Sequence, residues 1–291
     1  MIEPHARTAR TARTVRRRWC VATVLVMAAV VAACGDNSLA RSAGSFEPTR
    51  AGTLTVAAAF LPSAGFWEGA AQGDGFAASG GFEWELAVAL AHRFGLGGAT
   101  VVPVDFASLA AGDLGGADLG LSQFTPTAER RKVLDFSTPY LVAPPGVLAR
   151  PGVEAHDLAA LRELRWVVLD GSTLTDVVDD VVRPRSDPLV VGNRAEAFRA
   201  LDAGSADVVL LDLPVAVAQA AAAPDRFEVL AQLSGSEGLA AALPNGSANV
   251  EAVDSAIRAF LADGTIDDLS ERWLGTELAS GADDIPLIRT Q

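Results

Sequence analysis

The chain has 291 residues, of which 50% are hydrophobic and 20% charged, with 23 Lys and Arg against 36 Asp and Glu. This composition excludes a wholly disordered chain and leaves room for one large domain or two of ordinary size. The formal charge of −13 argues against a nucleic-acid partner, because neutralising phosphates requires clustered basic side chains.

The first 33 residues have the composition of an export signal. Six arginines precede residue 19, and the uncharged 13-residue run Val21–Ala33 follows them. A basic segment, a short apolar core and small residues before a cleavage site are typical of such signals, whereas a helix that spans a bilayer needs about 20 residues. We therefore predict a signal peptide over 1–33. Arg16-Arg17 leaves general secretion and twin-arginine export both open as the route.

The end of this segment, Val31-Ala32-Ala33-Cys34, resembles a bacterial lipobox. That resemblance implies that Cys34 is diacylated and becomes the new N-terminus, anchoring the protein to the outer face of the cell membrane. The alternative is an ordinary secretory signal with an unmodified cysteine. Cleavage removes six of the 23 basic and one of the 36 acidic side chains, which leaves a formal charge of −18. Residues 34–51 are small and polar, so we expect a flexible tether.

From Gly52 onward, short runs of β-forming residues alternate with helical patterns. The expected strands are Leu54–Ala59, Val101–Val104, Asp118–Ser122, Trp166–Leu169, Leu189–Val191, Val208–Leu211 and Phe227–Leu230. The expected helices are Phe82–Phe94, Asn193–Ala203, one beginning near Pro214, Val250–Ala262 and Ile266–Leu274. Residues 60–80 are rich in Gly and Ala and are expected to form a loop. The alternation predicts an α/β fold with parallel-type sheets flanked by helices.

The length of this α/β region predicts two lobes, since about 240 residues exceed what one sheet comfortably holds. Segments near Val142–Pro145 and Ser234–Gly238 are the candidate crossings between them. The first lobe is then discontinuous, comprising 52–143 and 239–278, and 144–238 form the second lobe. The tail 279–291 has no periodicity and is expected to be loose.

Four local features are candidates for function, and each has a simpler explanation. They are the tract from Ser122 to Arg130, which includes Gln123 and Thr125; the turn Gly171-Ser172-Thr173; Asp212; and the pair Phe66-Trp67. Taken singly, the tract could be a surface loop and the turn a helix cap. Asp212 could be an N-cap residue, and Phe66-Trp67 could belong to the core. A carboxylate at the C-terminal end of a parallel strand, such as Asp212, is nevertheless well placed for a ligand.

In order along the chain, these features resemble the bacterial extracellular solute-binding proteins of family 3, which serve polar amino-acid ABC importers. The resemblance covers about residues 50–276. Its most discriminating part is Thr125-Pro126…Arg130 followed by Asp135-Phe136-Ser137-Thr138-Pro139-Tyr140. The remaining matching motifs are Gly52–Val56, Gly81–Ala87, Leu201–Asp207, Ala262–Thr265 and Trp273–Gly275.

The resemblance implies a type II periplasmic-binding-protein fold whose two crossover segments form a hinge. It further implies a monomer that binds an amino acid between the lobes and delivers it to the membrane subunits of an ABC permease. No cofactor is implied. A metal site is not expected either, because histidines are scarce and no acidic cluster has the spacing of a calcium loop.

The resemblance also assigns roles to residues. Arg130 would grip the α-carboxylate with a two-pronged guanidinium, and Asp212 would receive the ammonium. The remaining ligand-binding candidates are Thr125, Ser172 and Thr173 around the carboxylate, Gln123 for specificity, and Phe66 or Trp67 as the aromatic contact.

Two other functions remain open. A lipoprotein of the same fold could sense an amino acid and report to a membrane kinase. An enzyme resembling cyclohexadienyl dehydratase is the second alternative. It is disfavoured because His92 and His156, the only histidines after the signal peptide, lie away from the candidate residues. We therefore expect a binding protein and not an enzyme.

Overall fold

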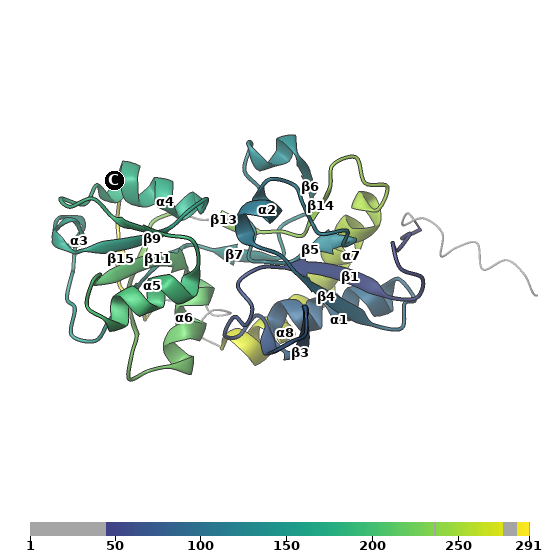
Figure 1. The fold of residues 1–291 in the computed structure, drawn as a ribbon, viewed down its shortest axis with the longest axis horizontal. Coiled ribbons are helices and arrows are strands. Elements are labelled where there is room, and N and C mark those ends of the chain that lie inside the picture. The colour runs from purple at the N-terminus through teal and green to yellow at the C-terminus, as the bar shows by residue number, and fades with distance from the viewer. Residues whose placement is uncertain (1–44, 236, 276–283, 291) are drawn as a thin grey trace, which may run out of the picture. The chain divides into compact units, whose positions relative to one another are not determined.

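The computed structural model describes residues 45–235, 237–275 and 284–290, which form two lobes (Figure 1). The first lobe is built on a seven-stranded sheet. Its strands, in spatial order, are β2 (Glu68–Gln72), β3 (Gly75–Gly80), β4 (Ala99–Pro103), β1 (Leu54–Ala58), β5 (Leu119–Gly120), β14 (Ala242–Pro244) and β6 (Leu134–Phe136). The pairs β1–β4 and β1–β5 are parallel, and antiparallel strands extend the sheet at both edges.

The second lobe has a six-stranded sheet of its own. Its spatial order is β10 (Leu189–Val191), β9 (Trp166–Leu169), β11 (Val208–Asp212), β8 (Pro145–Ala149), β12 (Glu228–Leu233) and β15 (Leu287–Ile288). Here β9 pairs in parallel with β10 and β11, whereas β8 runs antiparallel to β11 and β12. The expected α/β fold with parallel-type sheets is confirmed, and antiparallel strands complete each sheet.

Helices pack around both sheets. Those of the first lobe are α1 (Phe82–Arg93), α2 (Phe106–Ala110), α7 (Val250–Asp263), α8 (Thr265–Leu274) and the 3₁₀ turn η2 (Arg130–Lys132). Those of the second lobe are α3 (Leu158–Glu163), α4 (Thr173–Val177), the π-helical turn η3 (Val178–Val182), α5 (Arg194–Asp202) and α6 (Leu213–Ala222). Within the described residues, no helix is both long and apolar enough to cross a membrane.

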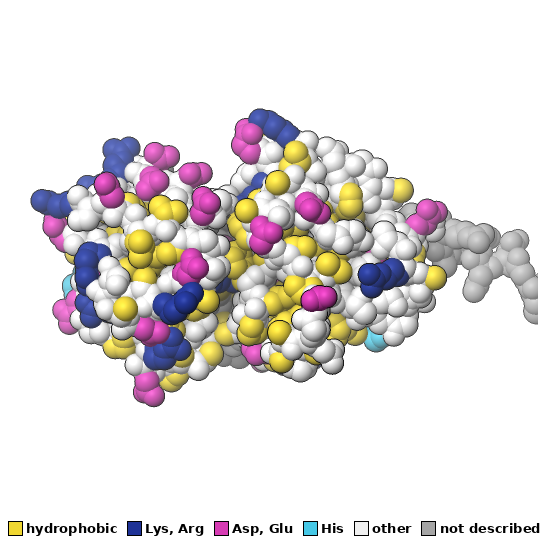
Figure 2. Space-filling model, viewed as in Figure 1, with side chains coloured by type: hydrophobic (Ala, Val, Ile, Leu, Met, Phe, Trp, Pro, Cys, Tyr) yellow, Lys and Arg dark blue, Asp and Glu magenta, His cyan; other side chains and the backbone are white. Residues whose placement is uncertain are grey.

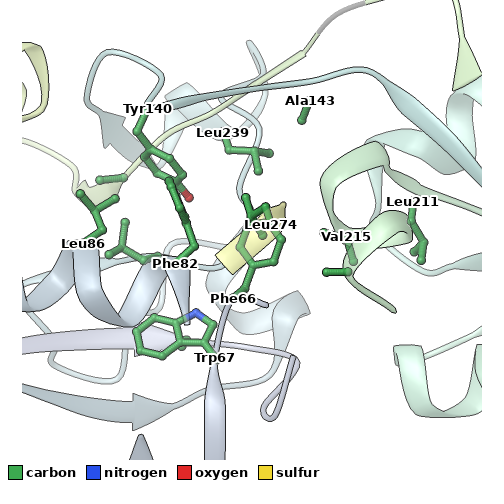
Figure 3. Close-up of a cluster of buried hydrophobic side chains, with 14 of the residues drawn as sticks. Phe66, Trp67, Phe82, Leu86, Tyr140, Ala143, Leu211, Val215, Leu239 and Leu274 are labelled. Atoms are coloured by element: carbon green, nitrogen blue, oxygen red, sulfur yellow. The ribbon is translucent and has the colours of Figure 1, made fainter. Parts of the chain in front are cut away.

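Two short strands connect the lobes. They are β7 (Leu141–Ala143) and β13 (Glu237–Leu239), which pair antiparallel with Val142 opposite Gly238. A buried apolar cluster continues from one lobe into the other beside them. Tyr140, Leu239 and Leu274 belong to it, together with Leu211 and Val215 of the second lobe (Figure 3). The lobes therefore share part of their hydrophobic core.

The start of α5 shows how local sequence fixes an element. The Asn193 side chain accepts a hydrogen bond from the backbone N–H of Glu196 at 3.0 Å, and Glu196 Oε2 accepts one from Gly192 at 3.1 Å. Gly204 follows the helix with φ of +66°, a left-handed conformation that glycine adopts without strain. The N-cap and the glycine stop predicted for this helix are confirmed, whereas Glu196 accepts from the N–H of Gly192 and not from that of Asn193, as a complete capping box requires.

Three expectations about irregular segments are wrong. Residues 60–80 are not simply a loop, because β2 and β3 form an antiparallel hairpin there. The end of the expected tether is bound to the first lobe: the Phe46 ring stacks on Phe94 at 4.2 Å, and the backbone of Glu47 pairs with the Asn249 side chain. Residues 34–44 of that tether, the signal peptide and Cys34 lie outside the described residues.

The third correction concerns the tail. Leu287 and Ile288 form β15, which pairs in parallel with Gln232 and Leu233 of β12. Ile288 is 4% exposed and packs in the core of the second lobe. Because this strand is only two residues long, its sequence carries no periodicity by which it could be recognised. The described part of the tail is therefore a strand of the second sheet.

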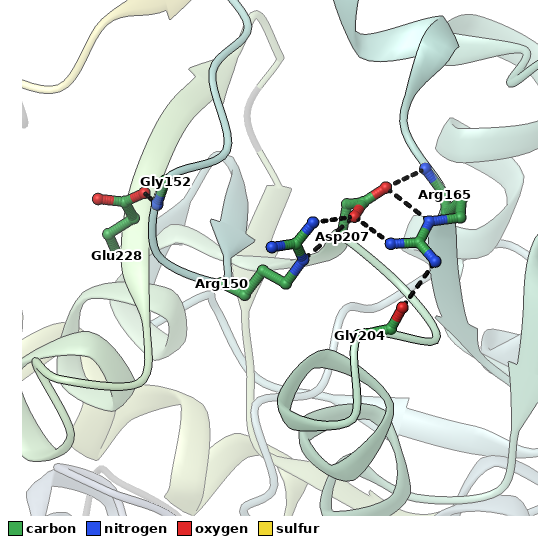
Figure 4. A network of polar contacts seen from close by, with 6 residues as sticks. All are labelled: Arg150, Gly152, Arg165, Gly204, Asp207 and Glu228. Atoms are coloured by element: carbon green, nitrogen blue, oxygen red, sulfur yellow. Dashed lines mark hydrogen bonds and ion pairs between the residues drawn. The ribbon is translucent and has the colours of Figure 1, made fainter.

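A charged cluster in the second lobe links the end of β8 to the starts of β9 and β11 (Figure 4). The carboxylate of Asp207 accepts hydrogen bonds from the guanidinium groups of Arg150, at 2.7 Å, and Arg165, at 2.6 Å, and from the backbone N–H of Arg165 at 3.0 Å. Asp207 is 7% exposed, whereas both arginines reach the surface. The hydrogen bonds from Arg165 are the main cause that holds the pKa of Asp207 well below its usual range.

We expect Asp207→Asn to lower the free energy of unfolding at neutral pH by about 1–3 kcal/mol, which is a fall in Tm of several degrees. Because the pKa of Asp207 is lower in the folded state, the stabilisation is complete above the ordinary Asp pKa of about 4 and is lost progressively as the pH falls from there through the lower folded-state pKa. Thermal melts from pH 7 to pH 3 should therefore show the difference between variant and wild type shrinking.

Asp202→Asn is the matched control, since Asp202 pairs with Arg226 at the surface of the same lobe. A surface pair of this kind contributes about 0–1 kcal/mol. Equal melting temperatures for the two variants at pH 7 would contradict the assignment.

Candidate functional site

A pocket between the two lobes is lined by side chains of both. The first lobe contributes Phe60, Phe106, Gln123, Thr125 and Arg130, and the second contributes Leu169, Ser172, Thr173, Leu174, Arg194, Leu211 and Asp212. The free space among these side chains is only about 20 Å³. It lies next to a groove of about 640 Å³, which shares Phe60, Phe106 and Arg194 with it. That volume is in the range of small-molecule sites.

The surface around this region is mixed in character. On the face in Figure 2, charged side chains of both signs are scattered over both lobes, and hydrophobic side chains lie at the surface between them. The groove itself is largely apolar, with Leu61, Pro62, Val104, Phe198 and Val215 among its lining residues.

Within residues 45–235, 237–275 and 284–290, no three His, Cys, Asp or Glu side chains gather in a way that could hold a metal ion.

Arg130 is the last residue of the Ser122–Arg130 tract and begins the turn η2. Its Nη1 donates to the carbonyl of Thr125 at 2.8 Å, and its Nη2 donates across the lobes to the carbonyl of Gly171 at 3.1 Å. The guanidinium lies over the Phe124 ring, 4.2 Å from its centroid, and the side chain is largely buried. These contacts fix the plane of the guanidinium at the pocket wall, where an anion could be bound.

Asp212 is the last residue of β11 and is 7% exposed. It stands at the N-cap position of α6, but its side chain does not form the cap hydrogen bond. The simpler explanation of Asp212 as a helix cap is therefore wrong. The neighbouring strand is β9, and Ser172 lies just beyond its C-terminal end. The Ser172 hydroxyl accepts a hydrogen bond from the Leu174 N–H at 3.3 Å. The site thus gathers at the C-terminal edge of parallel strands.

Behind the pocket lies a buried carboxylate, that of Glu83 on α1. It is fully buried and accepts hydrogen bonds from Trp67 Nε1 at 2.6 Å, from the backbone N–H of Gln123 at 2.7 Å, and from the Tyr140 hydroxyl and the Gln123 amide. Burial raises the pKa of Glu83, and these four donors oppose the shift. Burial, and then the charge of Glu83, raise the pKa of Tyr140. The network fixes Gln123, whose φ of +48° is rare outside glycine.

Arg194, at the start of α5, completes the network from the other lobe. Its Nη1 donates to Gln123 Oε1 at 2.7 Å and to Ser63 Oγ at 3.2 Å, and its guanidinium lies 4.2 Å from the centroid of the Phe60 ring. Burial lowers the pKa of Arg194 to about 10, against the opposing influence of Asp212 and Glu83. The guanidinium is therefore still charged at neutral pH.

The structure brings together six of the eight predicted ligand-binding residues, namely Gln123, Thr125, Arg130, Ser172, Thr173 and Asp212. Phe66 and Trp67 do not reach the pocket and are wrong as ligand contacts. Both are fully buried in the first lobe, where Phe66 packs edge-on against Phe82 (Figure 3). The indole N–H of Trp67 donates to Glu83.

Gly81 explains part of this placement. It has a φ of +111°, and a Cβ at this position would lie 2.3 Å from the carbonyl oxygen of Phe66. Only glycine lets the start of α1 approach the Phe66-Trp67 backbone so closely, and this approach accompanies the burial of both rings.

Six lining residues of the pocket were missed: the two aromatic residues Phe60 and Phe106, the cation Arg194, and Leu169, Leu174 and Leu211. In the sequence, Arg194 is only the second residue of a capping box. A usable signal was its place directly after β10, because β10 ends at the same edge of the sheet as β9 and β11. The aromatic residue of the first loop that faces the pocket is Phe60, which follows β1 by two positions.

Comparison with known proteins identifies the family. Residues 72–276 match the model of the bacterial extracellular solute-binding proteins, family 3. The L-cystine-binding protein TcyJ of Escherichia coli K12 is 28% identical over 202 residues, which are 68% of this chain and 75% of TcyJ.

Solved structures agree with this match. An ancestral arginine-binding protein bound to glutamine superposes with a TM-score of 0.66 at 28% identity, covering 78% of this chain and 99% of that one. A solute receptor for L-cysteine of Neisseria gonorrhoeae gives a TM-score of 0.66 at 28% identity, covering 77% and 90%. These relatives are binding proteins, and the two-lobed fold is confirmed. The chain belongs to the bacterial extracellular solute-binding proteins of family 3.

Proposed function

We propose that this protein captures a free amino acid between its two lobes and delivers it to the membrane subunits of an ABC importer, while a lipid on Cys34 anchors it to the cell membrane. The observation that carries the proposal is the meeting of Arg130 and Asp212, from opposite lobes, in one pocket. The names of the relatives support the ligand class, since they are binding proteins for cystine, arginine and cysteine.

The two charged residues match the two charges that every free amino acid carries. The guanidinium of Arg130 is held in a fixed plane by two backbone carbonyls, so a planar carboxylate can meet it through paired hydrogen bonds. Thr125, Ser172 and Thr173 surround the same part of the pocket and add polar groups. Asp212 supplies the anion for the ammonium. In place of Phe66 and Trp67, Phe60 is the aromatic contact.

The test is calorimetry of the full chain with each of the twenty amino acids, followed by variants with the ligand that binds best. Arg130→Ala and Asp212→Ala should each weaken binding by roughly 2–5 kcal/mol, or about 30-fold to several-thousand-fold, because each leaves one ligand charge buried without its partner. Arg130→Lys should not restore binding, since an ammonium cannot make the paired contact.

The matched control for these variants is Arg131→Ala, because Arg131 is exposed and adjacent to Arg130. It should bind as wild type does. Binding of all variants within about threefold of wild type would contradict the assigned site. Loss of binding in Arg130→Ala alone would point to a ligand without an α-ammonium.

Ligand binding should close the lobes about the paired segments β7 and β13. Small-angle X-ray scattering should therefore show a smaller radius of gyration at saturating amino acid than in its absence. Identical scattering profiles under the two conditions would contradict closure and favour a rigid body.

Cys34→Ala should release the protein from the membrane fraction into the medium, because the 13-residue apolar run before it is too short to span a bilayer. Cell fractionation and immunoblotting measure this. Cys20→Ala is the control, since Cys20 directly precedes the apolar run, far from the lipobox, and its replacement should not affect retention. Membrane retention of the Cys34→Ala protein equal to wild type would refute lipid anchoring.

A further inference from the structure

Arg194 is a buried cation whose hydrogen-bond acceptors are both neutral. The residue is 9% exposed, and its Nη1 donates to the Gln123 amide oxygen and the Ser63 hydroxyl. Its Nε is buried and has no hydrogen-bond partner among the described residues. An unmade hydrogen bond of a charged group is costly in a protein interior, so this arrangement calls for a further acceptor.

Gln123 separates Arg194 from the carboxylate behind it. The amide nitrogen of Gln123 donates to Glu83, which turns the amide oxygen toward Arg194. Glu83 is thus engaged by its four donors and does not contact the guanidinium directly. The positive charge of Arg194 therefore stays at the wall of the pocket, where the flat face of the guanidinium lies over the Phe60 ring.

The position of Arg194 sets what it would meet. It lines both the pocket that holds Arg130 and Asp212 and the groove beside it. A ligand whose α-groups lie between Arg130 and Asp212 would extend its side chain past the guanidinium toward the groove.

We propose that Arg194 makes the site selective for amino acids whose side chain ends in a carboxylate. The inference rests on the proposed amino-acid binding function and names its substrate class. A carboxylate is an acceptor that matches the donor fork of a guanidinium, including its unpaired Nε. A neutral side chain offers the guanidinium no charged hydrogen-bond acceptor, and a cationic side chain is repelled by it. Arg194 therefore favours one ligand class and also acts against another.

The experiment is calorimetry of the full chain with L-glutamate and L-glutamine, which have nearly the same shape, and with L-aspartate, L-asparagine and L-arginine. Wild type should bind glutamate about tenfold or more tightly than glutamine, aspartate more tightly than asparagine, and arginine weakest. In Arg194→Gln, the ratio of the glutamine to the glutamate Kd should fall to about one. If Arg194 had a purely structural role, its replacement would weaken the binding of every ligand equally and leave the ratio of the two Kd values unchanged.

Two further variants keep the test decisive. Arg194→Lys retains the charge without the fork, so it should keep part of the preference for glutamate even if Arg194→Gln fails to fold. Arg199→Gln removes an exposed arginine from the same helix and should leave the ratio as in wild type.

The outcomes separate the two proposals. Failure of every amino acid to bind wild type would refute the proposed function and this inference with it. Tight binding of glutamine or arginine with weak binding of glutamate would overturn the inference alone. An unchanged ratio in both Arg194 variants would also overturn it.

Discussion

The contact on which the rest of this site depends is the pair of hydrogen bonds made by the Gln123 amide. One end donates to the buried carboxylate of Glu83 in the first lobe, and the other accepts from Arg194 in the second. Water cannot compensate a lost partner at this depth, so each member of the network constrains the next. The unusual backbone of Gln123, with φ of +48°, is held in place by these contacts.

A single geometric rule explains where the pocket residues come from. Phe60 and Gln123 follow β1 and β5, which are parallel neighbours in the first sheet. Ser172, Arg194 and Asp212 follow or end β9, β10 and β11, which run in parallel in the second sheet. Parallel strands bring their C-terminal ends to one edge, and the connecting loops carry polar groups there. Two such edges facing each other make a site from residues more than 100 positions apart.

The sequence predicted what depends on local signals and missed what depends on long-range packing. The strand Trp166–Leu169 and the helix capped by Asn193 were predicted closely, because apolar runs and caps act within a few residues. The hairpin β2–β3 was missed, since its Gly and Ala residues have low β-propensity and pair only because the first sheet offers an edge.

The candidate site shows the same division. Arg130, Asp212 and their polar neighbours could be found because they lie in recognisable motifs. Arg194 was missed: its place after β10 indicates only that it lies near the site, and its role arises from a contact with Gln123, 71 residues away in the chain. The prediction of the aromatic ligand contact was wrong for a related reason. Phe60, Phe66 and Trp67 lie in one segment, and only packing against α1 decides which of these rings are buried in the core and which one lines the pocket.

The strand β15 has a consequence for the order in which the protein can be completed. Its partner β12 ends at Leu233, yet β15 itself is supplied by Leu287 and Ile288, more than fifty residues further along the chain. During synthesis from the N-terminus, the second sheet therefore keeps one edge of β12 open until Leu287 and Ile288 have been made. An open strand edge is a site for mispairing with other chains. The two residues of β15 thus cover the edge of a sheet whose other strands were made more than fifty residues earlier.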